Sequence, residues 1–257
     1  MKIKFNQSYE KKRNRELNEI RYDLSLLTNK HNYKKNIELI ADSELAESSP
    51  DHLHPTGTME DETRSPMFVS KVIDIFDRKI NYLDLGCSSG GLVFDFLEKG
   101  NLAVGIEGSD FSKRSERSFW KIIPNNLFTA DITKKFKLRI DGKPLKFDCI
   151  TAFEVLEHIQ TKDLDMLMEN IENHLNEDGI FLGSIGTKPS YSLDGVPLHL
   201  TIWDLKKWVD YLSNRFDSNL DLDFNFHEFP RGTGNGYQDP DFRVSPIGFY
   251  FSFKKKK

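Results

Sequence analysis

The clearest hydrophobic pattern lies in the first half of the chain. Tyr82 to Leu85 is a short apolar run of the kind that forms a buried strand, and the small residues 86–91 (GCSSGG) follow it as a tight turn. Apolar positions at helical spacing then occupy 92–97, and a second apolar run, 102–106, ends at Glu107. This order predicts a unit of strand, glycine-rich loop, helix and strand, with a carboxylate at the tip of the second strand.

The rest of the chain continues this alternation of strands and helices. Further strands are predicted at 127–130, 147–152 and 180–185, and crossover helices at 111–121 and 161–174. A small hairpin is expected within 134–146, a late helix at 203–212, and an antiparallel pair of edge strands at 220–229 and 247–253. The pattern therefore predicts an α/β fold with a doubly wound, mostly parallel sheet of seven strands.

The first 65 residues have a different character from the rest of the chain. We expect an amphipathic surface helix at 8–27, a weaker helix at 34–45, and a lid-like loop at 48–66, where prolines interrupt every periodicity. His52 and His54 in this loop are candidates for the substrate site, although a solvated loop histidine is the commoner case. The predicted domains are a helical extension with a lid, 1–65, and an α/β domain, 66–257.

The glycine-rich loop and Glu107 together indicate a nucleoside pocket. Small residues let backbone N–H groups approach a ligand at a helix N-terminus, and a carboxylate about 20 residues further on can accept both hydroxyls of a ribose. Ser88 replaces the middle glycine of the dinucleotide pattern, which makes the close approach of a pyrophosphate less available. A ligand with a ribose and no bridging diphosphate is favoured. The plainer alternative is a strand-helix-strand unit whose glycines serve packing only.

The segments DLGCSSGG (84–91) and GIEGSD (105–110) resemble motifs I and II of the class I S-adenosylmethionine-dependent methyltransferases. This resemblance implies a Rossmann-like methyltransferase domain with S-adenosylmethionine as the cofactor. The resemblance implies cofactor contacts from Asp84, Gly86, Cys87, Ser88, Gly90, Glu107, Gly108, Ser109, Asp131, Ile132 and Phe153. Asp131 has an alternative role as the cap of a turn or helix, because aspartate is a preferred cap.

The run FEVLEHI (153–159) follows the fourth strand, at the edge where open α/β sheets bind ligands. If this turn is helical, Glu154, Glu157 and His158 stand at i, i+3 and i+4 on one face. With His199 they resemble the metal site of the small-RNA 3′-terminal 2′-O-methyltransferases and of the catechol-methylating enzymes of ubiquinone biosynthesis. The resemblance implies that all four residues are catalytic and bind a divalent metal, Mg²⁺ or Mn²⁺, that holds adjacent acceptor hydroxyls.

The same run is also compatible with chemistry that needs no metal. Metal-free class I methyltransferases carry a similar run, in which His158 would be a general base or a satisfied buried histidine. We expect O-methylation of a hydroxyl, and N-methylation of an amino sugar without a metal is the alternative reaction. Two further alternatives belong to other functional classes. One is a module that binds S-adenosylmethionine without catalysis, and the other is a nucleotide-sugar or nicotinamide dehydrogenase.

Composition narrows the choice of partner and compartment. A net charge of −4 argues against a broad electrostatic footprint for nucleic acid, so we expect a small-molecule or glycan acceptor. No stretch approaches membrane-spanning length and 1–30 holds no apolar signal core, so neither insertion nor export is expected. Cys87 and Cys149 lie in expected core elements, which fits reduced thiols and a cytoplasmic setting. The oligomeric state stays open.

Overall fold

The computed structural model describes residues 36–55, 63–217, 244–245 and 248–256, together with the isolated helical positions Glu16, Leu17 and Ile20. These three positions are the only described part of the predicted helix at 8–27. The predicted strand at 220–229 lies outside the described residues. None of the helices in the described ranges has the length and apolar character that crossing a membrane requires.

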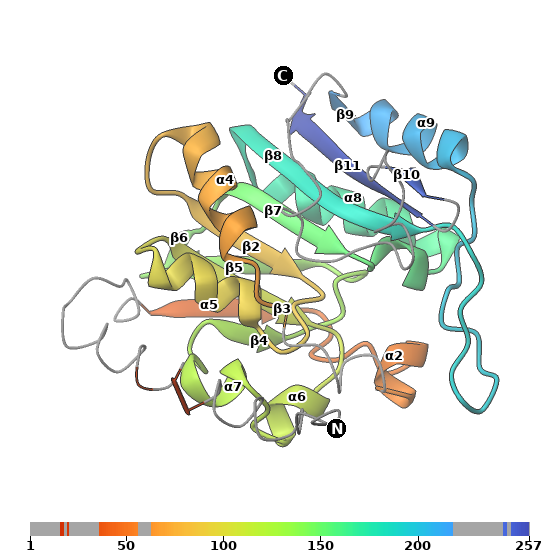
Figure 1. Ribbon diagram of the computed structural model, residues 1–257, viewed down its shortest axis with the longest axis horizontal. Coiled ribbons are helices and arrows are strands. Elements are labelled where there is room, and N and C mark those ends of the chain that lie inside the picture. The colour runs from red at the N-terminus through yellow and green to blue at the C-terminus, as the bar shows by residue number, and fades with distance from the viewer. Residues whose placement is uncertain are drawn as a thin grey trace, which may run out of the picture.

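The main sheet contains β2 (Asn81–Leu85), β3 (Leu102–Glu107), β4 (Leu127–Thr129), β7 (Phe147–Phe153), β8 (Leu175–Gly186), β9 (Phe216–Asp217), β10 (Val244–Ser245) and β11 (Gly248–Lys255). Its order is β10-β11-β8-β7-β2-β3-β4, and β9 pairs with β11 (Figure 1). β4, β3, β2, β7 and β8 run parallel, while β11 is antiparallel to β8. The predicted mostly parallel sheet is confirmed, with seven strands in this order and the short β9 added beside β11. The late run at 247–253 forms most of β11.

The central strands are buried along their whole length. β3 and β7 are buried at every position and β2 at all but its first, as expected for parallel strands covered on both faces. From β2 the chain moves to β3 and β4 on one side, whereas β7 and β8 are added on the other. The order of strands therefore reverses between β2 and β7, and a ligand crevice is expected beyond the carboxyl ends of these two strands.

Helices cover both faces of this sheet (Figure 1). The helices are α4 (Pro66–Phe76), α5 (Gly91–Glu98), α6 (Phe111–Arg114), α7 (Phe119–Ile122), α8 (Leu164–His174) and α9 (Leu205–Arg215). Apolar side chains of α4, α5 and α7 form one core cluster, and those of α8 and α9 belong to the other. The prediction of a single helix at 111–121 is wrong, because the positive φ of Glu116 and Ser118 (47° and 50°) breaks it into α6 and α7.

The N-terminal segment contributes a strand where a helix was predicted. β1 (Ile37–Ala41) lies within the predicted helix at 34–45 and pairs antiparallel with β5 (Phe136–Ile140). β5 also pairs with β6 (Lys143–Pro144), so the predicted hairpin within 134–146 is confirmed and β1 completes a small three-stranded sheet. The pairing gives the backbone of β1 its hydrogen-bond partners, and this tertiary contact overrides a weak local helix signal.

Asp148 in β7 joins three parts of the fold through hydrogen bonds. Its carboxylate, only 5% exposed, accepts hydrogen bonds from the Arg78 guanidinium at 2.8 Å, the Asn81 backbone N–H at 2.8 Å and the Asn176 side-chain amide at 2.8 Å. Burial raises the pKa of Asp148, but these three donors outweigh burial and hold the pKa below its ordinary value. The charged form of Asp148 therefore stabilises the folded state.

We expect Asp148→Asn to lower the free energy of unfolding at pH 7 by about 1.5–3 kcal/mol, because hydrogen bonds to a charged group are lost. The folded pKa is lowered, so the wild-type advantage is full above about pH 4 and is lost as the pH falls further. Chemical denaturation at pH 7 and pH 3 measures this, with exposed Asp178→Asn as the control. An equal deficit at both pH values would contradict the assignment.

Candidate active site

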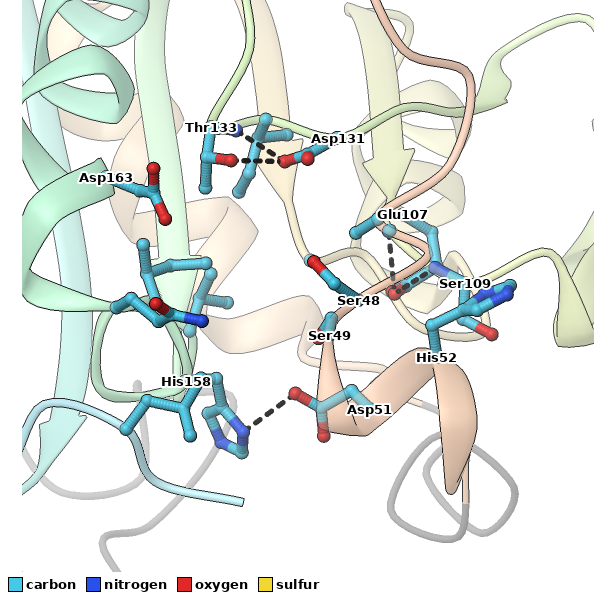
Figure 2. A pocket seen from close by; sticks show the side chains of 18 of the residues that line it. Ser48, Ser49, Asp51, His52, Glu107, Ser109, Asp131, Thr133, His158 and Asp163 are labelled. Atoms are coloured by element: carbon cyan, nitrogen blue, oxygen red, sulfur yellow. Dashed lines mark hydrogen bonds and ion pairs between the residues drawn. The ribbon is translucent and has the colours of Figure 1, made fainter. Parts of the chain in front are cut away.

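A cavity of about 290 Å³ opens beyond the carboxyl ends of β2, β3, β4 and β7, at the predicted switch point. Figure 2 shows its lining, in which side chains from the ends of these strands face a short N-terminal helix. The structure brings to this cavity the predicted residues Gly86, Ser88, Glu107, Gly108, Ser109, Asp131, Ile132, Glu154 and His158.

Glu107, at the tip of β3, holds the glycine-rich loop in place. One of its carboxylate oxygens accepts the Ser88 N–H at 2.7 Å, and the other accepts the N–H groups of Gly108 at 2.9 Å and Ser109 at 3.3 Å. Burial raises the pKa of Glu107 above its ordinary value, and these three donors oppose the rise. A carboxylate has about four lone-pair sites, so about one site remains to accept a ligand hydroxyl.

The loop between β2 and α5 needs glycine at its first position. Gly86 has φ of 70°, and a Cβ there would lie 2.5 Å from Cγ2 of Val155, which lines the cavity. The N–H groups of Gly86 and Cys87 donate to the carbonyl of Ile106 at 2.8 and 3.1 Å. The backbone of the loop therefore lies against the end of β3, directly beside the cavity.

Four predicted cofactor residues lie behind the cavity wall and do not line it. Asp84 accepts a hydrogen bond from the Thr151 hydroxyl at 2.7 Å and is 4% exposed. Cys87 is fully buried, Gly90 is the residue before α5 with φ of 82°, and Phe153 packs edge-on against a ring of α4. Asp131 lines the cavity and accepts the N–H and hydroxyl of Thr133, which confirms the turn-capping role, while its contact with the cofactor stays a prediction.

The N-terminal segment closes one side of the cavity. The Ala46 N–H donates to the Gly108 carbonyl at 3.0 Å, and the Asp131 N–H donates to the Ser43 carbonyl at 3.1 Å. After these contacts the chain forms α2 (Pro50–Leu53), inside the predicted lid-like loop. Of the two candidate histidines in this segment, His52 lines the cavity and His54 does not.

Several residues that line the cavity were not predicted, because the sequence around most of them shows no pattern that indicates a site. Pro50, at the first position of α2, is typical of a helix start and could have indicated this helix. The contacts of the segment with β3 and β4, in contrast, join positions far apart in the chain. The missed residues include Ala46, Ser48, Ser49, Asp51, Thr133, Gln160 and Asp163.

The turn after β7 is not the helix on which the predicted alignment of side chains depended. Glu154 has φ of 55°, and only Leu156–His158 forms a short 3-10 helix, η1. The prediction of one helical face is therefore wrong. The structure nevertheless brings together Glu157, His158 and His199, whose ligand atoms lie within 4.8 Å of one another. Glu154 stands beside this group, and one of its carboxylate oxygens accepts the Ser184 hydroxyl at 2.6 Å.

Burial and charge strongly perturb this cluster. Burial, followed by the charge of Glu154, raises the pKa of Glu157 to about 8. One Glu157 oxygen accepts the Gly186 N–H at 2.5 Å, while the other is buried without a partner among the described residues. Burial lowers the pKa of His158, but the neighbouring carboxylates, chiefly Asp51 with its oxygen 2.8 Å away, raise it to about 9. Burial and nearby His158 lower the pKa of His199.

Comparison with known families identifies this arrangement of strands, loop and cavity. Residues 60–221, more than half of the chain, match the family described as "Methyltransferase domain". The chain belongs to this methyltransferase family. The predicted membership of the class I S-adenosylmethionine-dependent methyltransferases is confirmed, and with it the enzyme class.

Solved methyltransferase structures share the fold of this methyltransferase at low identity. An S-adenosylmethionine-dependent methyltransferase from Clostridium acetobutylicum is 15% identical, with a TM-score of 0.53 over 77% of this chain and 93% of that one. The 1,6-didemethyltoxoflavin-N1-methyltransferase from Burkholderia thailandensis is 13% identical, with a TM-score of 0.52 over 80% and 84%. No curated protein sequence matches the chain. The structural similarities establish the fold.

The cluster in this methyltransferase fits a divalent metal ion. A Cβ built on Gly186 would lie 2.8 Å from Cε1 of His199, 2.9 Å from Oε1 of Glu157 and 3.5 Å from Oε2 of Glu154, so a side chain at this position would displace the cluster. The unpartnered Glu157 oxygen could serve as a donor once the carboxyl group loses its proton. Carboxylate and imidazole donors together suit Mn²⁺, Fe²⁺ or Zn²⁺, and carboxylates also suit Mg²⁺.

We expect Glu157→Gln to stabilise the metal-free protein increasingly as the pH rises. The folded pKa of about 8 lies above the unfolded value, so the stability contributed by protonated Glu157 is full at acidic pH and is lost as the pH rises toward 8. In chelator, the variant should match the wild-type Tm near pH 5 and exceed it at pH 8. Exposed Glu169→Gln is the control; a Tm difference that does not change with pH would refute this role of Glu157.

Proposed function

We propose that this methyltransferase transfers the methyl group of S-adenosylmethionine to a hydroxyl of a small-molecule or glycan acceptor. A divalent metal ion, Mn²⁺ or Mg²⁺, would be held by Glu157, His158 and His199. One observation carries the proposal: the ligand atoms of these three side chains lie within 4.8 Å of one another, and one of the three, His158, also lines the cavity beside the glycine-rich loop. This supports a metal site adjacent to the proposed cofactor pocket.

The lining of the cavity supports a specific placement of the cofactor. Glu107, at the tip of β3, is proposed to accept the ribose hydroxyls, since its carboxylate faces the cavity beside the loop. The backbone from Gly86 to Gly91 would contact the amino-acid end, and Asp131 the adenine. This placement directs the sulfonium toward the turn after β7, where Glu154 and the cluster lie.

Methyl transfer from a sulfonium is an in-line displacement, and the acceptor atom must be held about 3 Å from the methyl carbon. A protonated alcohol is a poor nucleophile at neutral pH. A bound divalent ion lowers the pKa of a coordinated hydroxyl and orients a neighbouring one. The chain's own contribution is to fix the donors and exclude water, which the complete burial of Glu157 supports. An acceptor with adjacent hydroxyls suits this arrangement best.

Metal-free N-methylation is the second candidate, and the pairing of His158 with Asp51 favours it. A histidine held by a carboxylate has the form of a general base. The N1-methyltransferase from Burkholderia thailandensis has the same fold, so the fold is compatible with a nitrogen acceptor. A pKa of about 9 keeps the His158 imidazole protonated near pH 7, so it would have to lose this proton to act as a base, just as it would to bind a metal ion. The metal-assisted reaction is favoured by a different observation, the convergence of Glu157, His158 and His199.

We expect Glu107→Ala to weaken the affinity for S-adenosylhomocysteine by about 10- to 150-fold, because hydrogen bonds to a charged group contribute about 1.5–3 kcal/mol. Isothermal titration calorimetry on folded protein measures this effect. Glu169→Ala, on the exposed side of α8, is the matched control and should bind like the wild type. Unchanged affinity in Glu107→Ala would remove the proposed ribose contact.

We expect the wild type to bind Mn²⁺ in calorimetry and His199→Ala to lose measurable binding, since the variant lacks one of three donors. His54→Ala serves as the control, because His54 lies outside the cluster.

An acceptor screen with S-adenosylmethionine should show methyl transfer to vicinal diols that stops in chelator and returns with Mn²⁺. Activity that survives complete chelation would exclude the metal-assisted reaction and favour the second candidate.

A further inference from the structure

A carboxylate from the N-terminal segment reaches the metal-ligand cluster on the far side of the cavity. Asp51 in α2 places an oxygen 2.8 Å from Nδ1 of His158, and Figure 2 shows the two side chains pointing toward each other across the opening. Both residues line the cavity. This contact joins two segments that are more than a hundred residues apart in the sequence.

The two histidines of the cluster have similar surroundings. In His199, Nδ1 lies 2.5 Å from the carbonyl oxygen of Lys188, so an Nδ1–H donated to this carbonyl leaves Nε2 with a free lone pair. In His158, Nδ1 faces Asp51, which likewise leaves Nε2 as the nitrogen available to a metal. The two rings meet edge to face, with centroids 4.8 Å apart. Histidines that bind metals usually donate their other N–H to a carboxylate or carbonyl, which fixes ring orientation and tautomer.

We infer that Asp51 is a positioning residue for His158: its carboxylate pairs with Nδ1 and leaves Nε2 as the nitrogen available to a metal ion. This inference rests on the metal site of the proposed function. Asp51 acts through His158 and does not itself belong to the cluster of three ligands.

The position of Asp51 also connects the metal site with the cofactor. The segment that carries it is fixed to β3 by the hydrogen bond from the Ala46 N–H to the Gly108 carbonyl, and Ser48, Ser49 and His52 line the same cavity as Glu107. A nucleoside in the cavity would contact this segment and hold α2, and thereby Asp51, in place. Cofactor and metal therefore strengthen each other's binding through Asp51, and this coupling is reciprocal.

Calorimetric titration of the full-length protein with Mn²⁺ tests the inference. We expect Asp51→Ala to bind Mn²⁺ about 10- to 100-fold more weakly than the wild type, the usual effect of losing a hydrogen-bond partner of a metal ligand. Asp51→Asn should restore part of the affinity, because its amide oxygen still accepts a hydrogen bond. Glu47→Ala removes an exposed carboxylate from the same segment and should leave the affinity unchanged.

The same titrations repeated in saturating S-adenosylhomocysteine test the coupling. The wild type should bind Mn²⁺ at least about 5-fold more tightly with this ligand than without it, whereas Asp51→Ala should show a ratio near one. If a folded Asp51→Ala variant binds Mn²⁺ as tightly as the wild type, the role of Asp51 is refuted and the metal site stands. If the wild type binds no Mn²⁺, the proposed metal-assisted function fails and this inference fails with it.

Discussion

The interaction on which the site depends is the set of hydrogen bonds that Glu107 accepts from the backbone. Three N–H groups, of Ser88, Gly108 and Ser109, converge on one buried carboxylate, and they join the glycine-rich loop after β2 to the tip of β3. The cavity exists because these two strand ends are held together while the sheet order reverses between β2 and β7. The N-terminal segment then closes the cavity by bonding to Gly108. The backbone at Gly108 therefore contacts both Glu107 and the N-terminal segment that closes the cavity.

A second constraint acts at the reaction edge, where negative charge is buried. Glu157 is inaccessible to water, one of its oxygens has no partner among the described residues, and Glu154 and Asp51 add further carboxylates nearby. Burying charge without compensation is costly, and proteins relieve it by protonation, pairing or metal binding. Burial raises the pKa of Glu157, which favours its protonated form, and the nearby carboxylates raise the pKa of His158, which favours its ion pair with Asp51. Under the proposed function, a divalent cation would replace these protons.

The sequence predicted the parts of the protein that are determined locally. The strand, loop, helix and strand unit around Glu107 lies within a continuous segment, so its glycines and apolar runs could be interpreted without tertiary information. β1 could not be predicted in this way, because it becomes a strand by pairing with β5, about a hundred residues later. Glu157 and His158 do meet His199, through the hydrogen bonds that the Leu200 and Thr201 N–H groups donate to the Glu157 carbonyl, and this long-range contact has no local signal. The contact between Asp51 and His158 has no local signal at all.

The measurement that tests this account most directly is anomalous diffraction at the manganese edge, on crystals of the protein grown with S-adenosylhomocysteine and Mn²⁺. We expect one anomalous peak bounded by Glu157, His158 and His199, with the ribose of the ligand against Glu107 and Asp51 on the other nitrogen of His158. S-adenosylhomocysteine bound in the cavity with no anomalous signal at this cluster would contradict the metal-assisted reaction.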